Sequence, residues 1–168
     1  MSALAQLQRL AEHVGAAVAL PPDRMAREIK AALRDATAEA NWLPPERRRA
    51  NHERYARHLL YGDPAGRFSI LVLVWDPGQT SPIHSHNTWC AVAVYQGVLT
   101  ETFYRDRGPG RPPMPTGTAR RGAGSLSFER ALSAIHRLAN DSGAIAVSLH
   151  VYGIAKEHVN DGVNRLYA

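Results

Sequence analysis

The sequence predicts a mainly β protein, a barrel with α-helices at its N-terminus packed on it. Two observations support this prediction. Apolar residues recur at helical spacing only near the start of the chain, whereas from about residue 53 short runs rich in Val, Ile, Tyr and Phe alternate with turn residues. Many short strands separated by turn signals are typical of a sandwich or barrel. Because 168 residues, 45% of them hydrophobic, suit a single domain, we expect a helical cap over residues 1–50 and a barrel over residues 53–168.

Two helices are expected before the barrel. The first spans residues 3–19, where apolar side chains repeat at intervals of three or four, and the Pro21-Pro22 pair ends it. The second spans residues 23–40 and also carries apolar residues on one face. Asp23 is its expected N-cap, since a short side-chain oxygen can accept a hydrogen bond from a free N–H of the first turn.

The rest of the chain is expected to form strands joined by turns. The expected strands are residues 54–60, 68–75, 83–86, 89–96, 98–104, 125–129, 134–138, 145–152 and 164–167. Segment 105–118 is rich in Gly, Pro and Arg, which favours a loop without regular structure.

Charge and cysteine content narrow the function. The net charge is +5, but the basic residues are scattered apart from residues 47–49, so we expect no nucleic-acid partner. The single cysteine, Cys90, excludes a disulfide framework and fits a reducing compartment. Charged residues interrupt the apolar stretch at the N-terminus, which predicts neither a signal peptide nor a membrane span. We therefore expect a soluble cytoplasmic protein, and the sequence predicts no oligomeric state.

The most informative stretch contains His84 and His86. In a strand, residues i and i+2 point to the same side, so two imidazoles are presented together. Gly78 precedes this pair and Gly97 follows it at distances that resemble the first cupin motif. The resemblance implies a single cupin domain, a double-stranded β-helix or jelly-roll barrel. Cupins often place a glutamate after the second histidine, and Cys90 stands near that place.

A metal site in which the protein ligands occupy one face of the ion needs a third ligand, and His136 is the candidate. The sequence from His136 to Asn140 resembles the end of the second cupin motif, although the proline and glycine that usually precede it are missing. A buried histidine whose ring bonds a backbone group is the alternative for an isolated His136. His150 can also serve as the third ligand in its place.

A second polar pattern lies in residues 147–152. Ser148, His150 and Tyr152 alternate with apolar residues, so one strand face is polar. Turned into a barrel, these groups can satisfy one another, because Ser148 can fix the tautomer of His150 and His150 can orient the Tyr152 hydroxyl. An amphipathic strand with its polar face in water is the alternative.

Together these segments resemble the cysteine dioxygenase group of cupin thiol dioxygenases, over about residues 54–152. The resemblance implies one iron(II) ion per chain. It implies that the iron ligands are His84, His86 and His136, and that Ser148, His150 and Tyr152 form a catalytic hydrogen-bonded chain beside them. It also implies that Arg57 clamps the substrate carboxylate, with Tyr55 on the same face, and that Cys90 is the cysteine that forms a thioether with Tyr152 in some members.

The chain departs from the animal enzymes of this group at several positions. The spacing between His86 and Cys90 is one residue shorter, which favours Cys90 as a small buried side chain over the crosslink. Gly153 and Trp89 are similar to bacterial 3-mercaptopropionate dioxygenases, whereas those enzymes have glutamine where this chain has Arg57. L-Cysteine is therefore the preferred expected substrate and 3-mercaptopropionate the alternative.

The ligand set suits this chemistry. Three neutral imidazoles leave iron(II) with its full dipositive charge, which a substrate thiolate can balance. A small thiol and dioxygen are thus the expected partners, and both oxygen atoms add to sulfur to give a sulfinate. A non-catalytic metal-binding cupin or sensor module is the competing interpretation, and three histidines can also hold zinc for hydrolysis.

Overall fold

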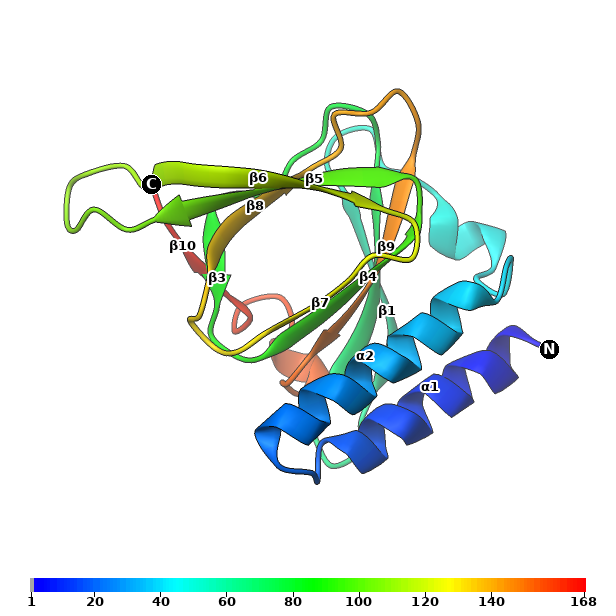
Figure 1. Ribbon diagram of the computed structural model, residues 1–168. Coiled ribbons are helices and arrows are strands. Elements are labelled where there is room, and N and C mark those ends of the chain that lie inside the picture. The colour runs from blue at the N-terminus through cyan, green and yellow to red at the C-terminus, as the bar shows by residue number, and fades with distance from the viewer. Residues whose placement is uncertain (1) are drawn as a thin grey trace.

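The structure, a computed structural model that describes residues 2–168, has two N-terminal helices followed by ten strands in two antiparallel sheets (Figure 1). The first sheet contains, in spatial order, β1 (Ala56–Gly62), β2 (Ser69–Trp75), β9 (Ala146–Tyr152), β4 (Cys90–Gln96) and β7 (Leu126–Glu129). The second contains β10 (Asn164–Leu166), β3 (His84–His86), β8 (Ile135–Ala139), β5 (Val98–Arg105) and β6 (Met114–Gly122). The sheets curve around a common interior, which confirms the predicted mainly β barrel with helices packed on it.

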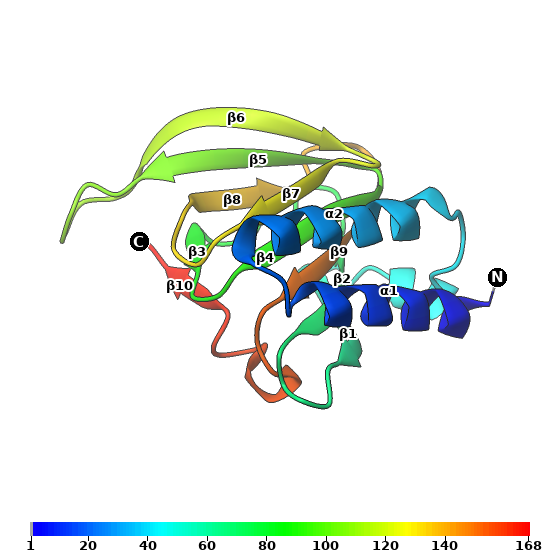
Figure 2. The same cartoon turned by 60° about the horizontal axis from the view of Figure 1, so that its bottom comes forward.

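The helices α1 (Ala3–Ala17) and α2 (Pro22–Ala38) lie side by side against the outside of the first sheet (Figures 1 and 2). The prediction that Asp23 caps the second helix is wrong, because Pro21 is the N-cap and makes no side-chain cap bond. Proline at the first helical position loses no hydrogen bond, so the helix begins earlier than predicted, at Pro22. Neither helix has the length and apolar content needed to cross a bilayer.

Strand β9 is buried along its whole length because the first sheet is covered on both faces. Its apolar residues, such as Leu149, belong to the same cluster as Leu33 of α2 and so face the helices. Since side chains alternate along a strand, the polar residues Ser148, His150 and Tyr152 point the other way, into the barrel. The alternative of a strand whose polar face lies in water is therefore wrong.

Strand β6 shows that the predicted loop over residues 105–118 is wrong over its last five residues. Residues from Met114 onward pair with β5 in a long hairpin, so the irregular segment is limited to residues 106–113. An edge strand that is mostly exposed needs few apolar residues and tolerates proline. Pro115 lies where the register shifts opposite Tyr104, and the Gly- and Pro-rich composition therefore did not exclude a strand.

Two short 3-10 helices, η1 (Pro45–Arg48) and η2 (Lys156–His158), complete the chain. The tight connection from β4 to β5 depends on Gly97, whose φ of +76° is unfavourable for other residues. A Cβ atom there would also lie 2.8 Å from the carbonyl oxygen of Ile145. This glycine therefore holds the turn close to the neighbouring loop.

Candidate metal centre

Three histidines converge inside the barrel from two neighbouring strands. His84 and His86 lie on β3, and His136 on β8 is the register partner of His84, so the three side chains share a face. All three are buried, and their ring centroids are 4.6–5.1 Å apart. Each offers one ring nitrogen, and these atoms lie within 4.8 Å of one another. Nitrogens grouped in this way are candidates for the ligands of one metal ion.

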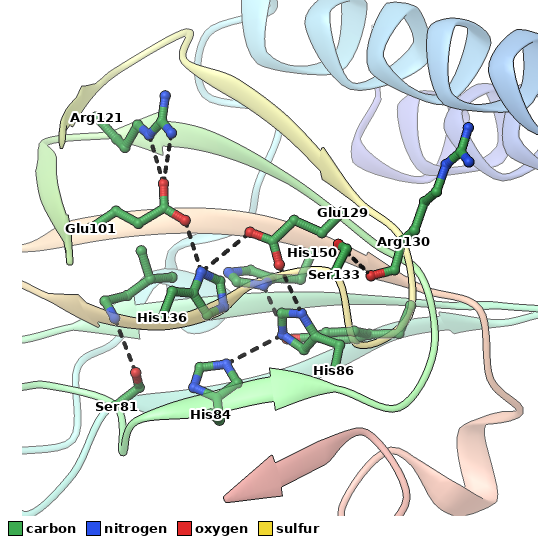
Figure 3. Close-up of polar contacts among 12 residues, drawn as sticks. Ser81, His84, His86, Glu101, Arg121, Glu129, Arg130, Ser133, His136 and His150 are labelled. Atoms are coloured by element: carbon green, nitrogen blue, oxygen red, sulfur yellow. Dashed lines mark hydrogen bonds and ion pairs between the residues drawn. The ribbon is translucent and has the colours of Figure 1, made fainter. Parts of the chain in front are cut away.

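An oxygen acceptor fixes the orientation of each of these rings, and Figure 3 shows the two glutamates that contact His86 and His136. The Nδ1 atoms contact the Pro82 carbonyl at 2.9 Å for His84, Glu129 Oε2 at 3.2 Å for His86, and Glu101 Oε1 at 2.7 Å for His136. Because these oxygens accept, each Nδ1 donates a proton to its partner. The Nε2 atoms face away from these partners and are the nitrogens that can bind a metal.

The Nε2 atoms are not satisfied by protein groups. Nε2 of His136 is buried and has no hydrogen-bond partner among the described residues. Nε2 of His84 and Nε2 of His86 lie 3.3 Å apart and contact each other but no further group in the part of the chain that the structure describes. Burial, and then the nearby His136, lower the pKa of His84 to about 3, so that its ring stays neutral. Three facing lone pairs in a buried space fit a divalent metal that accepts imidazole ligands.

Two glutamates support the histidines, and their roles were missed in the sequence. Glu101 of β5 is buried and bonds both His136 and Arg121, and Glu129 of β7 contacts His86 and, at 3.3 Å, His136. Burial disfavours the ionised Glu101, but hydrogen bonds from His136 and Arg121 outweigh it and lower the pKa of this carboxyl. The predicted ligand set contains no carboxylate, and the structure places these two carboxylates behind the histidines, where they contact the rings.

A weak signal for Glu101 was present in the sequence. Leu99 and Glu101 are two residues apart in a strand and therefore share its inner face, where both are buried. A charged residue on an otherwise apolar strand face indicates a buried partner. Glu129 follows no comparable pattern, because its neighbours in the sequence do not reveal which side of β7 is buried.

The predicted polar chain of β9 is continuous and extends to one further residue. Ser148 Oγ lies 2.8 Å from His150 Nε2, and His150 Nδ1 lies 3.0 Å from the Tyr152 hydroxyl. Trp75 Nε1, which can only donate, bonds Ser148 Oγ at 3.0 Å. Both ring nitrogens of His150 are thus engaged, and the structure does not bring it together with His84 and His86 as a third ligand.

One arrangement of protons lets every group in this chain take part in a hydrogen bond. With Trp75 donating to Ser148, the serine hydroxyl can donate to His150 Nε2, and the imidazole proton is then on Nδ1. In this arrangement the Nδ1–H donates to the Tyr152 oxygen, and the tyrosine O–H is free to donate elsewhere. Burial lowers the pKa of His150 and raises that of Tyr152, so both groups stay neutral at pH 7.

Arg57 and Tyr55 line the same pocket as the three histidines and Tyr152. One guanidinium N–H of Arg57 donates to the Val159 carbonyl at 2.8 Å, so its partner is a backbone oxygen and not a carboxylate side chain. Tyr55 precedes β1 and stacks on Trp75 with ring centroids 4.4 Å apart. The pocket is small, with a cavity volume of about 20 Å³, and a wider cleft outside shares Tyr55 and Arg57 as walls. The pocket beside the histidines and the outer cleft therefore meet at these two side chains.

Cys90 and Tyr152 face each other across β4 and β9, where they are direct register partners. Their side chains lie on the same face of the sheet, beside the histidines. Cys90 is buried, and burial together with Glu129 and Glu101 raises the pKa of its thiol well above the usual value. The thiol is therefore protonated and unreactive at neutral pH.

We predict that Cys90 in the folded protein resists iodoacetamide at pH 8, because the buried thiol supplies almost no thiolate. Intact-mass measurement should show no adduct before unfolding and one adduct after unfolding in guanidinium chloride. Rapid alkylation of the folded protein would contradict this. A thioether to Tyr152 would instead give no adduct in either state and a mass lower by two hydrogen atoms.

Comparisons with known proteins define the relationship of this chain. A family model described as cysteine dioxygenase type I matches residues 24–160. The chain belongs to the cysteine dioxygenase type I family. A cysteine dioxygenase type 1 of Danio rerio is 32% identical over 103 residues, which are 59% of this chain and 51% of that relative. The chain thus spans about half the length of the curated relative it matches.

Solved structures support the fold of this cysteine dioxygenase family member. A protein of Klebsiella pneumoniae described as having a double-stranded beta-helix domain matches with a TM-score of 0.54 and 17% identity, over 77% of this chain and 99% of that one. A protein of Thermus thermophilus matches with a TM-score of 0.52 and 21% identity, over 67% and 95% of the two chains. These likenesses confirm the predicted double-stranded β-helix barrel.

Trp89 and Gly153 of this family member pack on each other. The N–H of Gly153 donates to the Trp89 carbonyl at 3.0 Å, and Thr88 Oγ1 donates to the Gly153 carbonyl at 2.6 Å. A Cβ atom on Gly153 would overlap the Trp89 indole and lie 2.7 Å from Thr88 Oγ1. The indole therefore requires glycine at position 153.

We predict that Gly153→Ser destabilises the protein by about 3 kcal/mol, because a rigid indole cannot move out of the way of the new side chain. Thermal or urea unfolding measures this change. Gly143→Ser is the matched control, since nothing lies within 4 Å of a Cβ atom at Gly143. In a Trp89→Ala background the cost of Gly153→Ser should shrink, and an unchanged cost would place the strain elsewhere.

Proposed function

We propose that this protein is a non-heme iron(II) dioxygenase that adds both atoms of dioxygen to the sulfur of L-cysteine, giving cysteine sulfinate. The observation that carries the proposal is the convergence of ring nitrogens from His84, His86 and His136 beside a pocket that contains Arg57. Membership of the cysteine dioxygenase type I family supports the same reaction.

The three histidines would hold the metal through Nε2, since their Nδ1 atoms already donate to oxygen acceptors. When bound, the metal supplies a positive charge that favours the thiolate and a centre at which dioxygen reacts with sulfur. Arg57 would grip the substrate carboxylate with its remaining N–H groups, while the Val159 carbonyl fixes the guanidinium. The substrate is then held at both ends.

Tyr152 would donate the hydrogen bond that orients the substrate within the pocket. Trp75, Ser148 and His150 direct their protons along one chain, so the Tyr152 O–H remains available to a substrate oxygen. Because burial raises the pKa of Tyr152, this donor persists throughout the neutral pH range. Tyr55, fixed by its stacking on Trp75, would close the pocket beside Arg57.

3-Mercaptopropionate is the second candidate substrate. The contact between Trp89 and Gly153 favours it, because these two residues are similar to the bacterial 3-mercaptopropionate enzymes and depend on each other in the fold. Arg57 favours cysteine, since the 3-mercaptopropionate enzymes have glutamine at this position. Both thiols carry the carboxylate that a guanidinium binds.

The test combines metal analysis with oxygen uptake. Protein purified without added metal is analysed for iron and zinc, then given cysteine, 3-mercaptopropionate, cysteamine and homocysteine in an oxygen electrode. We expect iron, uptake that is fastest with cysteine, and one sulfinate formed per dioxygen consumed. Absence of uptake with every thiol after iron loading would refute the proposal, and zinc without uptake would favour a hydrolase or a binding module.

A further inference from the structure

We infer that Glu101 and Glu129 are positioning residues that set the metal affinity of the centre by holding the Nδ1–H groups of His136 and His86. This inference rests on the metal site proposed above. The Glu101 contact is short, at 2.7 Å, and Glu101 is only 3% exposed, while the partly buried Glu129 lies 3.2 Å from His86. Glu129 also reaches His136 with its other oxygen, at 3.3 Å, so one carboxylate connects two rings.

The three rings therefore differ as electron donors. His84 donates its Nδ1–H to a neutral backbone carbonyl, whereas His86 and His136 donate to carboxylates. A carboxylate acceptor makes the opposite nitrogen more basic, and loss of such a partner commonly weakens metal binding about 10–100-fold. His136 contacts both carboxylates, so we expect it to be the strongest donor of the three.

The same two glutamates and His136 Nδ1 lie close enough to be considered a second cation site. Arg121 argues against that alternative, because it bonds Glu101 Oε2 at 2.7 Å and occupies the position of a counter-charge. The other Glu101 oxygen is used by the Nδ1–H of His136. The carboxylates therefore act as hydrogen-bond acceptors, and the cation belongs on the Nε2 side.

Glutamine substitutions test the role of charge, because a glutamine keeps an acceptor oxygen but removes the negative charge. Full-length protein stripped of metal is titrated with zinc in competition with a chromophoric chelator. We expect one zinc per chain in the wild type and a dissociation constant about 10–100-fold higher in Glu101→Gln. Glu129→Gln should change in the same direction. Glu12→Gln, at an exposed position of α1, is the matched control and should bind zinc as the wild type does.

Arg121→Met distinguishes tuning of the metal site from simple support of the fold. If the Glu101–Arg121 pair only stabilised the barrel, both Glu101→Gln and Arg121→Met would weaken zinc binding. If Glu101 has the inferred role, Arg121→Met removes a competing partner of Glu101, whose carboxylate then interacts with His136 alone. The substitution also removes a positive charge near the metal site. Arg121→Met should therefore bind zinc at least as tightly as the wild type.

A second readout follows the hydrogen bonds directly. In the zinc-loaded wild type, ¹H–¹⁵N spectra should show slowly exchanging Nδ1 protons of His136 and His86 far downfield, and Glu101→Gln should move the His136 signal upfield. If Glu101→Gln does not fold, Glu129→Gln and the His86 signal decide. Unchanged zinc affinity and spectra in both variants would overturn the inference and leave the proposed function intact. Two zinc ions per wild-type chain would also overturn it, whereas no zinc binding at all would remove the proposed metal site as well.

Discussion

Replacing His136 with alanine is expected to abolish tight metal binding and thiol oxidation together. The remaining pair, His84 and His86, would offer two nitrogens from one short strand, which cannot close a site on one face of the ion. We expect the metal dissociation constant to rise by more than about 100-fold, beyond the effect of losing an outer hydrogen-bond partner. Metal analysis and oxygen uptake measure the two losses.

Thermal unfolding gives an independent measure of the same change. Metal at a concentration 100 times its dissociation constant stabilises a folded protein by about 2.7 kcal/mol, which corresponds to a rise in Tm of roughly 5–10 °C in a domain of this size. The wild type should show this rise and His136→Ala should not. His13→Ala, in α1 and outside the barrel, is the control. A full metal complement in His136→Ala would refute the assignment of this ligand.

Arg57→Gln is expected to lower kcat/KM for L-cysteine by about 100-fold. Hydrogen bonds between charged partners contribute about 1.5–3 kcal/mol, and about 2.7 kcal/mol corresponds to a factor of 100 in rate. The guanidinium lies in the pocket with the histidines and is held by the Val159 carbonyl. Because the bacterial 3-mercaptopropionate enzymes have glutamine at this position, the substrate preference of Arg57→Gln should shift from L-cysteine toward 3-mercaptopropionate.

Two controls separate binding of the carboxylate from general damage to the pocket. Cysteamine has no carboxylate, so its slow oxidation should be the same in Arg57→Gln and the wild type. Arg54→Gln removes a neighbouring guanidinium that lines the outer cleft and should leave cysteine kinetics near those of the wild type. Equal losses for cysteine and cysteamine in Arg57→Gln would show that Arg57 shapes the pocket and does not clamp the carboxylate.

Much of the barrel could be predicted because its strands bury at least one face. The alternation in residues 147–152 predicted correctly which side chains of β9 share a face, since side-chain direction in a strand has a period of two. Strand β6 could not be predicted from composition, because an exposed edge strand is selected for neither apolar nor β-branched residues. The start of α2 was missed because proline at its first position replaced a side-chain cap.

The candidate site was predictable where the chemistry is local in sequence. His84 and His86 are two residues apart, and the spacing of the polar residues of β9 is regular, so their relative directions follow from strand geometry. Glu101 and Glu129 come from strands in different sheets and meet only at His136. No local pattern predicts that meeting, because it depends on how the two sheets close around the interior.

The coverage of β9 on both faces has a consequence for how the molecule moves. Its amide hydrogens, paired on either side with β2 and β4 and shielded by α2, should exchange with solvent only when the whole molecule opens. Tyr152 therefore lies on a strand that we expect to be among the most rigid parts of the protein. A substitution in α2, such as Leu33→Ala, removes packing from the opposite face of the sheet and can increase the mobility of Tyr152 without changing a residue of the pocket.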